Sequence, residues 1–338
     1  MRLTYTPYTL ELQHTFTVSS NSRSTTPIII TQITYEGFIG YGEASMPPYL
    51  EETSNSVQKF LSKVKLQQFN DPLDIAAIHE YVDGIESGNT AAKASIDIAM
   101  HDLIGKIHNK PLYELWGFDP EKTPFTSYTI GIDTPSITAK KVAEANDFRF
   151  LKIKLGVEND KSIIETIRKI TNKPLYVDVN QGWKDKYYAL DMIFWLQENG
   201  VVMVEQPLPK NQLNDIAWLT SESPLPIIAD EGIQRLDDLK TLNGIYSGVN
   251  IKLMKCTGLF EAKKMINLAR KLGLKTMIGC MTETSCGVSA AAQLSPIVDY
   301  ADLDGPLLIK NDMFTGINFI NGKIGLSNKP GIGVSLKL

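Results

Sequence analysis

The feature that most constrains this chain is a repeat in which a short apolar segment ends in a charged or polar residue. From residue 126 onward the segments are TSYTIGI, FLKIKLG, PLYVDVN, VVMVEQP, PIIADEG, GVNIKLM, KTMIGCM and VDYADLD. From Lys154 to Asp302, the polar residues at or near the ends of successive segments lie 24, 27, 25, 22, 28 and 22 positions apart. One strand, one helix and two loops fill about 25 residues, so eight such units predict a (β/α)8 barrel with its chemistry at the C-terminal strand ends.

The sequence before the repeat predicts a separate α+β unit. Residues 1–43 alternate polar and apolar positions like a β-meander, with SSNSRSTTP expected as a polar loop. Residues 53–117 have the apolar spacing of helices, and residues 313–327 predict a final strand pair that could return to this unit. The expected domains are an α+β capping domain over 1–118, completed by 313–338, and a barrel over 119–312. A doubly wound open sheet is the alternative, but no glycine-rich phosphate loop follows the first strand.

Composition excludes several classes of protein. The net charge is −4 without blocks of like charge, so no nucleic-acid partner is expected. No apolar run approaches the roughly 18 residues of a membrane span, and the N-terminus lacks the apolar core of a signal peptide. The three cysteines form no disulfide pattern, which indicates a reducing, cytoplasmic setting. All four histidines precede the barrel, so a histidine base or zinc site within it is not expected.

Three carboxylates end consecutive predicted strands. Asp178, Glu205 and Asp230 terminate the third, fourth and fifth strands of the repeat and would point into one region. Clustered buried carboxylates are costly unless a cation offsets their charge. Ligation by oxygen alone favours Mg²⁺, or Mn²⁺, over zinc, so we predict one such ion per subunit.

Lysines flank this predicted metal site. Lys152 and Lys154 share one face of the second strand because side chains alternate along a strand. Lys154 and Lys252 lie on strands two and six, which are opposite in a ring of eight. They suit a reaction with a base on one face of a carbon and an acid on the other, while the metal and Lys152 hold an adjacent carboxylate. Lys255 cannot share the strand face of Lys252, so it is interpreted as structural or solvent-facing.

Two further charged features predict substrate contacts. Asp302 and Asp304 share a face of the last strand, which is expected to lie far from the metal site. A carboxylate pair placed there would suit a substrate ammonium group. Arg23 lies in the polar SSNSRSTTP segment and could pair with a substrate carboxylate if that segment covers the barrel mouth.

Together these motifs resemble the enolase superfamily, specifically its muconate-lactonizing subgroup. The resemblance covers nearly the whole chain and rests on GYGEA, KIK, DVNQGW, VEQPLP, ADEG and NIKLMKCTG. Within the subgroup, DLDGP is similar to the DxD signature of dipeptide epimerases. SNSRS is similar to the capping loop of L-Ala-D/L-Glu epimerases, whose arginine meets the glutamate side chain.

The resemblance implies a Mg²⁺-dependent dipeptide epimerase. Lys154 and Lys252 would move the α-proton of the C-terminal residue, Asp302 and Asp304 would bind the dipeptide's ammonium group, and Thr129, Cys280 and Thr282 would contact the substrate. Dipeptides derived from murein would be the substrates, which implies peptidoglycan recycling. The oligomeric state is left open, with a homo-oligomer as one possibility because relatives often assemble. The alternatives are o-succinylbenzoate synthase, N-acylamino acid racemase and, from another class, a non-catalytic dipeptide-binding barrel.

Overall fold

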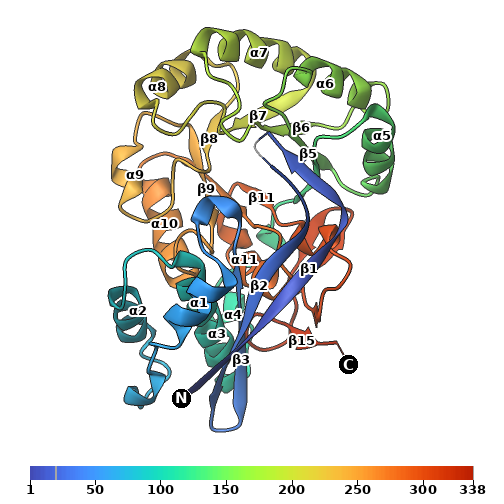
Figure 1. Cartoon of the computed structure of the whole chain (residues 1–338). Coiled ribbons are helices and arrows are strands. Elements are labelled where there is room, and N and C mark those ends of the chain that lie inside the picture. Colours follow the sequence, from blue (N-terminus) through green and yellow to red (C-terminus); the bar gives the residue numbers. More distant parts are fainter. Residues whose placement is uncertain (20, 338) are drawn as a thin grey trace.

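A ring of eight parallel strands forms the centre of the computed structural model, which describes residues 1–19 and 21–337 (Figure 1). Each strand pairs with its neighbours in chain order, and a parallel bridge between Thr126 and Ala301 joins the last strand to the start of the first. The ring strands are β4 (Ser127–Ile130), β5 (Phe150–Lys154), β6 (Leu175–Asp178), β7 (Val201–Glu205), β8 (Ile227–Ala229), β9 (Gly248–Lys252), β10 (Lys275–Gly279) and β11 (Tyr300–Asp302). The predicted (β/α)8 architecture is confirmed.

Helices cover the outside of the ring and bury apolar side chains against the strands. They are α5 (Pro135–Glu144), α6 (Asp160–Arg168), α7 (Lys186–Glu198), α8 (Leu213–Glu222), α9 (Asp238–Thr241), α10 (Leu259–Lys271) and α11 (Ser285–Ala292). Side chains of Thr134, Asp185 and Thr284 accept hydrogen bonds from N–H groups at the starts of α5, α7 and α11, which explains where these helices begin. Because both faces of each strand are covered, the strands are rich in Ile, Val and Leu.

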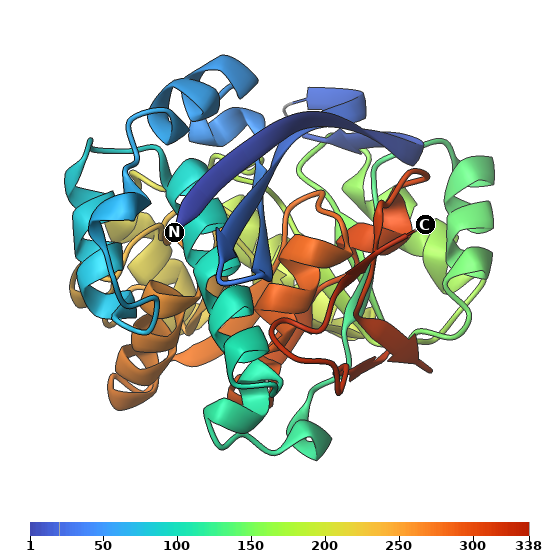
Figure 2. The same ribbon diagram turned by 90° about the horizontal axis from the view of Figure 1, so that it is seen from below.

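The N-terminal unit is a three-stranded antiparallel sheet with helices packed on it. Its elements are β1 (Arg2–Val18), β2 (Asn21–Tyr35), β3 (Phe38–Ser45), α1 (Ser54–Leu61), α2 (Ile75–Gly84), α3 (Thr90–Ile107) and α4 (Leu112–Leu115). Seen from below, α3 runs between this sheet and the barrel (Figure 2). Gly42 permits the close contact with α3, because a Cβ there would lie 1.9 Å from the Ser95 carbonyl oxygen.

A carboxylate of the N-terminal sheet binds the start of a helix of the barrel. Glu43 of β3 is fully buried and accepts hydrogen bonds from the N–H groups of Thr284 and Gly287, at distances of 3.0 and 3.1 Å, at the start of α11. A negative charge at a helix N-terminus is favourable, since the N–H groups there lack partners within the helix. This contact fixes the N-terminal unit beside the C-terminal ends of the strands.

The sequence predicted a polar loop over SSNSRSTTP, and this prediction is wrong for most of the segment. Ser20 lies outside the described residues, whereas Asn21 onward belongs to β2, in which Arg23 pairs with Phe16 of β1. The β1–β2 hairpin extends across to the barrel near β5 (Figure 1). Polar residues can continue a strand when pairing with the neighbouring strand satisfies their backbone groups, and no periodicity within the segment reveals this.

The C-terminal segment contacts both units. Its strands are β12 (Phe314–Thr315), β13 (Asn318–Ile320), β14 (Lys323–Gly325) and β15 (Ser335–Leu336). The predicted strand pair exists as the β13–β14 hairpin, but it lies against the barrel, where the Thr126 N–H donates to the Gly322 carbonyl oxygen at 2.8 Å. Residues on both sides of this hairpin reach the N-terminal unit: the Phe314 ring centroid lies 5.4 Å from that of Tyr41, and the Leu112 N–H donates to the Gly331 carbonyl oxygen at 3.0 Å. The predicted domain boundaries stay predictions.

No helix within residues 1–19 and 21–337 is long and apolar enough to cross a membrane.

Candidate active site

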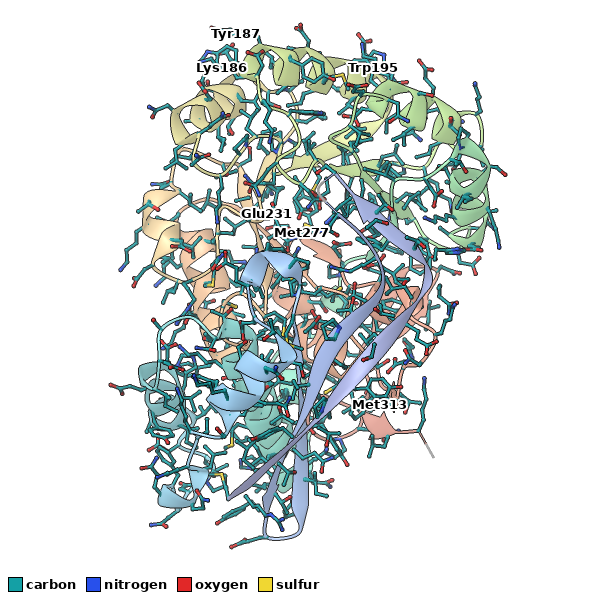
Figure 3. The ribbon with its side chains drawn as sticks, in the orientation of Figure 1. Lys186, Tyr187, Trp195, Glu231, Met277 and Met313 are labelled. Atoms are coloured by element: carbon teal, nitrogen blue, oxygen red, sulfur yellow. The ribbon has the colours of Figure 1, made fainter. Side chains whose placement is uncertain are left out.

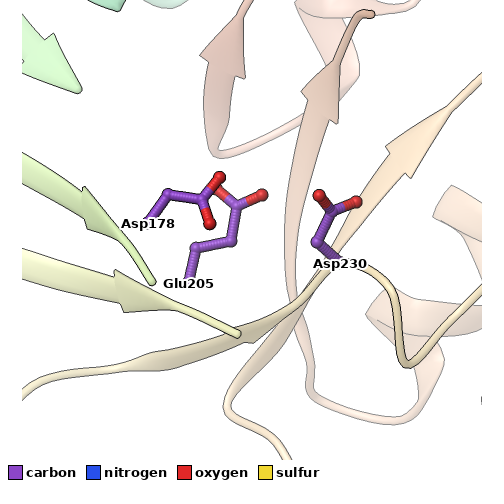
Figure 4. Close-up of side chains that lie close together, drawn as sticks. All are labelled: Asp178, Glu205 and Asp230. Atoms are coloured by element: carbon purple, nitrogen blue, oxygen red, sulfur yellow. The ribbon is translucent and has the colours of Figure 1, made fainter. Parts of the chain in front are cut away.

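The three predicted metal ligands meet at the C-terminal end of the ring. Asp178 and Glu205 end β6 and β7 and stand opposite each other in register, and Asp230 follows β8 by one residue. One carboxylate oxygen from each lies within 4.8 Å of the others (Figure 4). All three side chains are buried.

The electrostatics of this cluster fit a cation. Burial and the neighbouring Asp178 raise the pKa of Glu205 to about 7, although Lys152 opposes the shift. Burial also acts to raise the pKa of Asp178, but Lys154 and Lys152 outweigh it and hold the pKa below its usual value. Three buried oxygen donors at this spacing could hold a hard divalent cation, because they supply the ligand type such ions prefer.

Lysines approach the cluster from several strands. The Lys152 Nζ lies 2.7 Å from Glu205 Oε2 and 3.0 Å from Asp178 Oδ2. The Lys154 Nζ lies 2.6 Å from Asp178 Oδ2, and the Lys252 Nζ lies 2.7 Å from Asp230 Oδ2. Since β5 and β9 are separated by three strands in either direction around the ring, Lys154 and Lys252 enter from opposite walls.

The aspartate pair lies closer to the cluster than the sequence suggested. Asp302 Oδ2 contacts the Lys152 Nζ at 2.7 Å, so one ammonium group joins it to the predicted metal ligands. The expectation that the pair lies far from the metal site is therefore wrong, because only β4 separates β11 from β5 and a lysine side chain reaches the ring centre. Asp304 Oδ2 accepts a hydrogen bond from the Thr129 N–H at 2.6 Å. Burial, together with Asp302, raises the pKa of Asp304 to about 7.

These groups surround one cavity of about 740 Å³. Ten of the twelve predicted site residues line it: Arg23, Thr129, Lys152, Lys154, Asp230, Lys252, Cys280, Thr282, Asp302 and Asp304. Arg23 reaches it from β2, where its Nη2 donates to Thr282 Oγ1 at 2.9 Å. Burial lowers the pKa of Arg23, and no acceptor among the described residues contacts its Nε. Because Arg23 lines the cavity, its guanidinium group can pair with an acidic group there.

Several residues that support the site were not predicted. Asn250 of β9 donates from its Nδ2 to Glu205 Oε1 at 2.9 Å; it stands two residues from Lys252, so strand alternation could have identified it. Glu231 lies toward the middle of the barrel, whereas Lys186, Tyr187 and Trp195 all lie on the outer helix α7 (Figure 3).

Glu231 also belongs to the cavity lining, where Asn180 Nδ2 donates to its Oε1 at 3.1 Å. Burial and the adjacent Asp230 raise the pKa of Glu231 to about 7. Glu231 directly follows Asp230 in the sequence, and this position next to a predicted ligand could have identified it.

The position of Lys255 decides between its two predicted roles, structural and solvent-facing. Its side chain is only 1% exposed, so the solvent-facing alternative is wrong. The Nζ donates to Asp230 Oδ1 at 2.6 Å, which places the lysine directly behind a predicted metal ligand. The backbone turns after β9 and directs this side chain toward Asp230, and the alternation of side chains along a strand does not predict such a turn.

Comparisons with known proteins give one consistent result. Residues 3–117 match the family described as mandelate racemase / muconate lactonizing enzyme, N-terminal domain, and residues 137–338 match the family described as enolase C-terminal domain-like. A Bacteroides thetaiotaomicron L-Ala-D/L-Glu epimerase is 59% identical over 99% of this chain and 88% of its own.

Solved structures agree with the sequence relatives. A substrate-liganded L-Ala-D/L-Glu epimerase from Bacillus subtilis superimposes with a TM-score of 0.94 at 28% identity, covering 100% of this chain and 99% of the other. A dipeptide epimerase from Enterococcus faecalis, complexed with Mg and L-Leu-L-Tyr, superimposes with a TM-score of 0.91 at 33% identity, covering 98% of each chain.

Proposed function

The chain belongs to the enolase superfamily, in its mandelate racemase / muconate lactonizing enzyme branch, and we propose that it is an L-Ala-D/L-Glu epimerase. The observation that carries the proposal is the entry of Lys154 and Lys252 from opposite walls beside three clustered carboxylates. Inversion at a carbon needs an acid and a base on its two faces, and this arrangement provides them.

The carboxylates of Asp178, Glu205 and Asp230 would hold a magnesium ion, with Mn²⁺ as a substitute. When bound, Mg²⁺ would offset the negative charge that develops on the substrate carboxylate as the α-proton leaves. Lys152 supports the same end of the substrate, because its ammonium group lies among these carboxylates and lines the cavity.

The two opposed lysines exchange one proton for another at the α-carbon. A neutral amine on one side removes the α-proton and becomes an ammonium group. The ammonium group on the other side donates a proton to the opposite face, which inverts the configuration and leaves that lysine neutral. The reverse reaction uses Lys154 and Lys252 in exchanged roles, so each lysine acts as the base toward one epimer.

Charged residues that line the cavity would select the dipeptide. Asp302 and Asp304 would bind the α-ammonium group of the N-terminal alanine, for which buried carboxylates are suited. Arg23 would bind the glutamate side chain, supported by its place in the cavity wall, and Thr129, Thr282 and Cys280 complete the walls. A cytoplasmic role in recycling murein dipeptides follows from this substrate, and a homo-oligomer stays a prediction.

Turnover of L-Ala-L-Glu in D₂O by the Mg²⁺-loaded protein tests the proposal. We expect L-Ala-D-Glu to form with deuterium at the glutamate α-carbon, measured by mass spectrometry and proton NMR. Dipeptide binding without exchange would instead indicate a non-catalytic barrel. Turnover of the o-succinylbenzoate precursor, or of N-acyl amino acids in preference to dipeptides, would favour the other members of the subgroup.

A further inference from the structure

We propose that Lys255 is a positioning residue that holds Asp230 in the orientation required of a metal ligand. The inference rests on the proposed function, since it assumes that the carboxylate cluster binds Mg²⁺. Lys255 follows the end of β9 by three residues and is almost completely buried. All three donors of its ammonium group have acceptors: Asp230 Oδ1 at 2.6 Å, the Asp230 carbonyl oxygen at 2.7 Å and the Asn250 carbonyl oxygen at 2.9 Å.

The two carboxylate oxygens of Asp230 have different partners. Oδ1 is held from behind by Lys255, whereas Oδ2 points into the site, 2.7 Å from the Lys252 Nζ. Because Lys255 also binds the carbonyl oxygen of Asp230, it fixes both the backbone and the carboxylate plane. Second contacts of this kind orient metal ligands and raise metal affinity.

Lys255 acts only through other residues. Over the described residues, the cavity lining contains Lys252 but not Lys255, so Lys255 has no route to the substrate. Its ammonium charge lies beside Asp230 without occupying space inside the carboxylate cluster. It therefore compensates part of the buried negative charge while leaving the inner oxygens available to a cation.

The same contacts extend to a second ligand through Asn250. This residue accepts from Lys255 with its carbonyl oxygen and donates from its side chain to Glu205 Oε1 at 2.9 Å. Gly279 of β10 leaves room for that side chain, because a Cβ there would lie 2.4 Å from Asn250 Oδ1. Lys255 and Asn250 thus support two of the three proposed ligands.

Lys93 offers a closely matched control far from the site. It is buried to 2% exposure and its Nζ also donates to a carboxylate oxygen of one residue, the carbonyl oxygen of that residue and one further carbonyl oxygen. These acceptors are Asp83 Oδ1 at 2.9 Å, Asp83 O at 3.1 Å and Glu86 O at 2.7 Å. Lys255→Met and Lys93→Met therefore each remove a buried ammonium group with the same three kinds of acceptor. Of the two ammonium groups, only that of Lys255 contacts a proposed metal ligand.

The test measures the Mg²⁺ dissociation constant of the full-length wild type and both variants by isothermal titration calorimetry. Electron paramagnetic resonance of bound Mn²⁺ gives a second readout, and thermal unfolding reports stability. We expect Lys255→Met to weaken Mg²⁺ binding about 10- to 100-fold and to alter the Mn²⁺ spectrum. Lys93→Met should lose stability but keep wild-type metal affinity.

The outcomes separate the inference from the function on which it rests. Wild-type Mg²⁺ affinity in folded Lys255→Met would overturn the positioning role, as would an equal loss of affinity in both variants. Absence of Mg²⁺ binding by the wild-type protein would instead overturn the proposed function. If Lys255→Met does not fold, Lys255→Gln, which keeps a polar side chain without the charge, carries the same test with the same expected loss.

Discussion

Replacing Asp304 by asparagine tests whether this carboxylate recognises the ammonium group of a dipeptide. The side chain is 3% exposed, and its Oδ2 accepts a hydrogen bond from the Thr129 N–H at 2.6 Å. The asparagine carbonyl oxygen can accept that same hydrogen bond. The substitution therefore removes a negative charge from the cavity while changing the shape of the site little.

The expected magnitude follows from the burial of this charge. Removing one partner of a buried, hydrogen-bonded charge pair costs about 2–5 kcal/mol. At about 1.4 kcal/mol for each factor of ten, kcat/KM for L-Ala-L-Glu should fall about 30- to 4,000-fold. The loss should vanish for a substrate without an ammonium group, since its partner is then absent from both enzymes.

The assay measures each of two enzymes with each of two substrates and compares the four values of kcat/KM. Wild type and Asp304→Asn are each measured with L-Ala-L-Glu and with N-propionyl-L-Glu, which lacks the ammonium group, at a pH above 8 and saturating Mg²⁺. Deuterium incorporation from D₂O gives kcat/KM in all four cases. We expect the variant to change kcat/KM for the propionyl compound by about twofold or less. An equal fall for both substrates would refute ammonium recognition by Asp304.

Three further predictions follow from the same contacts. Because burial raises the pKa of Asp304 to about 7 and only its ionised form attracts an ammonium group, kcat/KM for L-Ala-L-Glu should fall as the pH drops below about 7, and Asp304→Asn should show a shallower fall in a pH profile; identical profiles for both enzymes would contradict this role. Arg23→Met should reduce kcat/KM for L-Ala-L-Glu at least about tenfold while sparing L-Ala-L-Leu, as measured by competition between the two dipeptides; equal losses would contradict side-chain recognition. Glu43→Ala leaves the N–H groups of Thr284 and Gly287 without their acceptor, so the free energy of unfolding should fall by about 2–6 kcal/mol in urea denaturation, and an unchanged value would contradict the contact.

The barrel and its carboxylate cluster were predictable because both follow from strand order alone. In a closed parallel ring all C-terminal strand ends meet on one side, so a polar residue at the end of each strand has only one place to point. Asp178, Glu205 and Asp230 could therefore be brought together without knowledge of any side-chain conformation. The opposite placement of Lys154 and Lys252 follows from counting strands.

Features that depend on contacts between distant residues were not predictable. The strand containing Arg23 is stabilised by pairing with Phe16, and its own polar sequence indicates a loop. The contact between Lys152 and Asp302 depends on the length of a lysine side chain across the ring centre. The burial of Lys255 depends on how the chain turns after β9. Side-chain reach and the path of a turn are three-dimensional properties, and residue spacing does not encode them.

Separate removal of the two opposed lysines tests the central claim most directly. Lys154→Ala and Lys252→Ala are each incubated in D₂O with L-Ala-L-Glu and, separately, with L-Ala-D-Glu, and α-deuteration is followed by proton NMR. Neither variant should epimerise the dipeptide at an appreciable rate, but each should exchange the α-proton of one epimer, and the two variants should differ in which epimer they exchange. Loss of exchange from the same epimer in both variants would place the two amines on one side of the α-carbon and contradict the account.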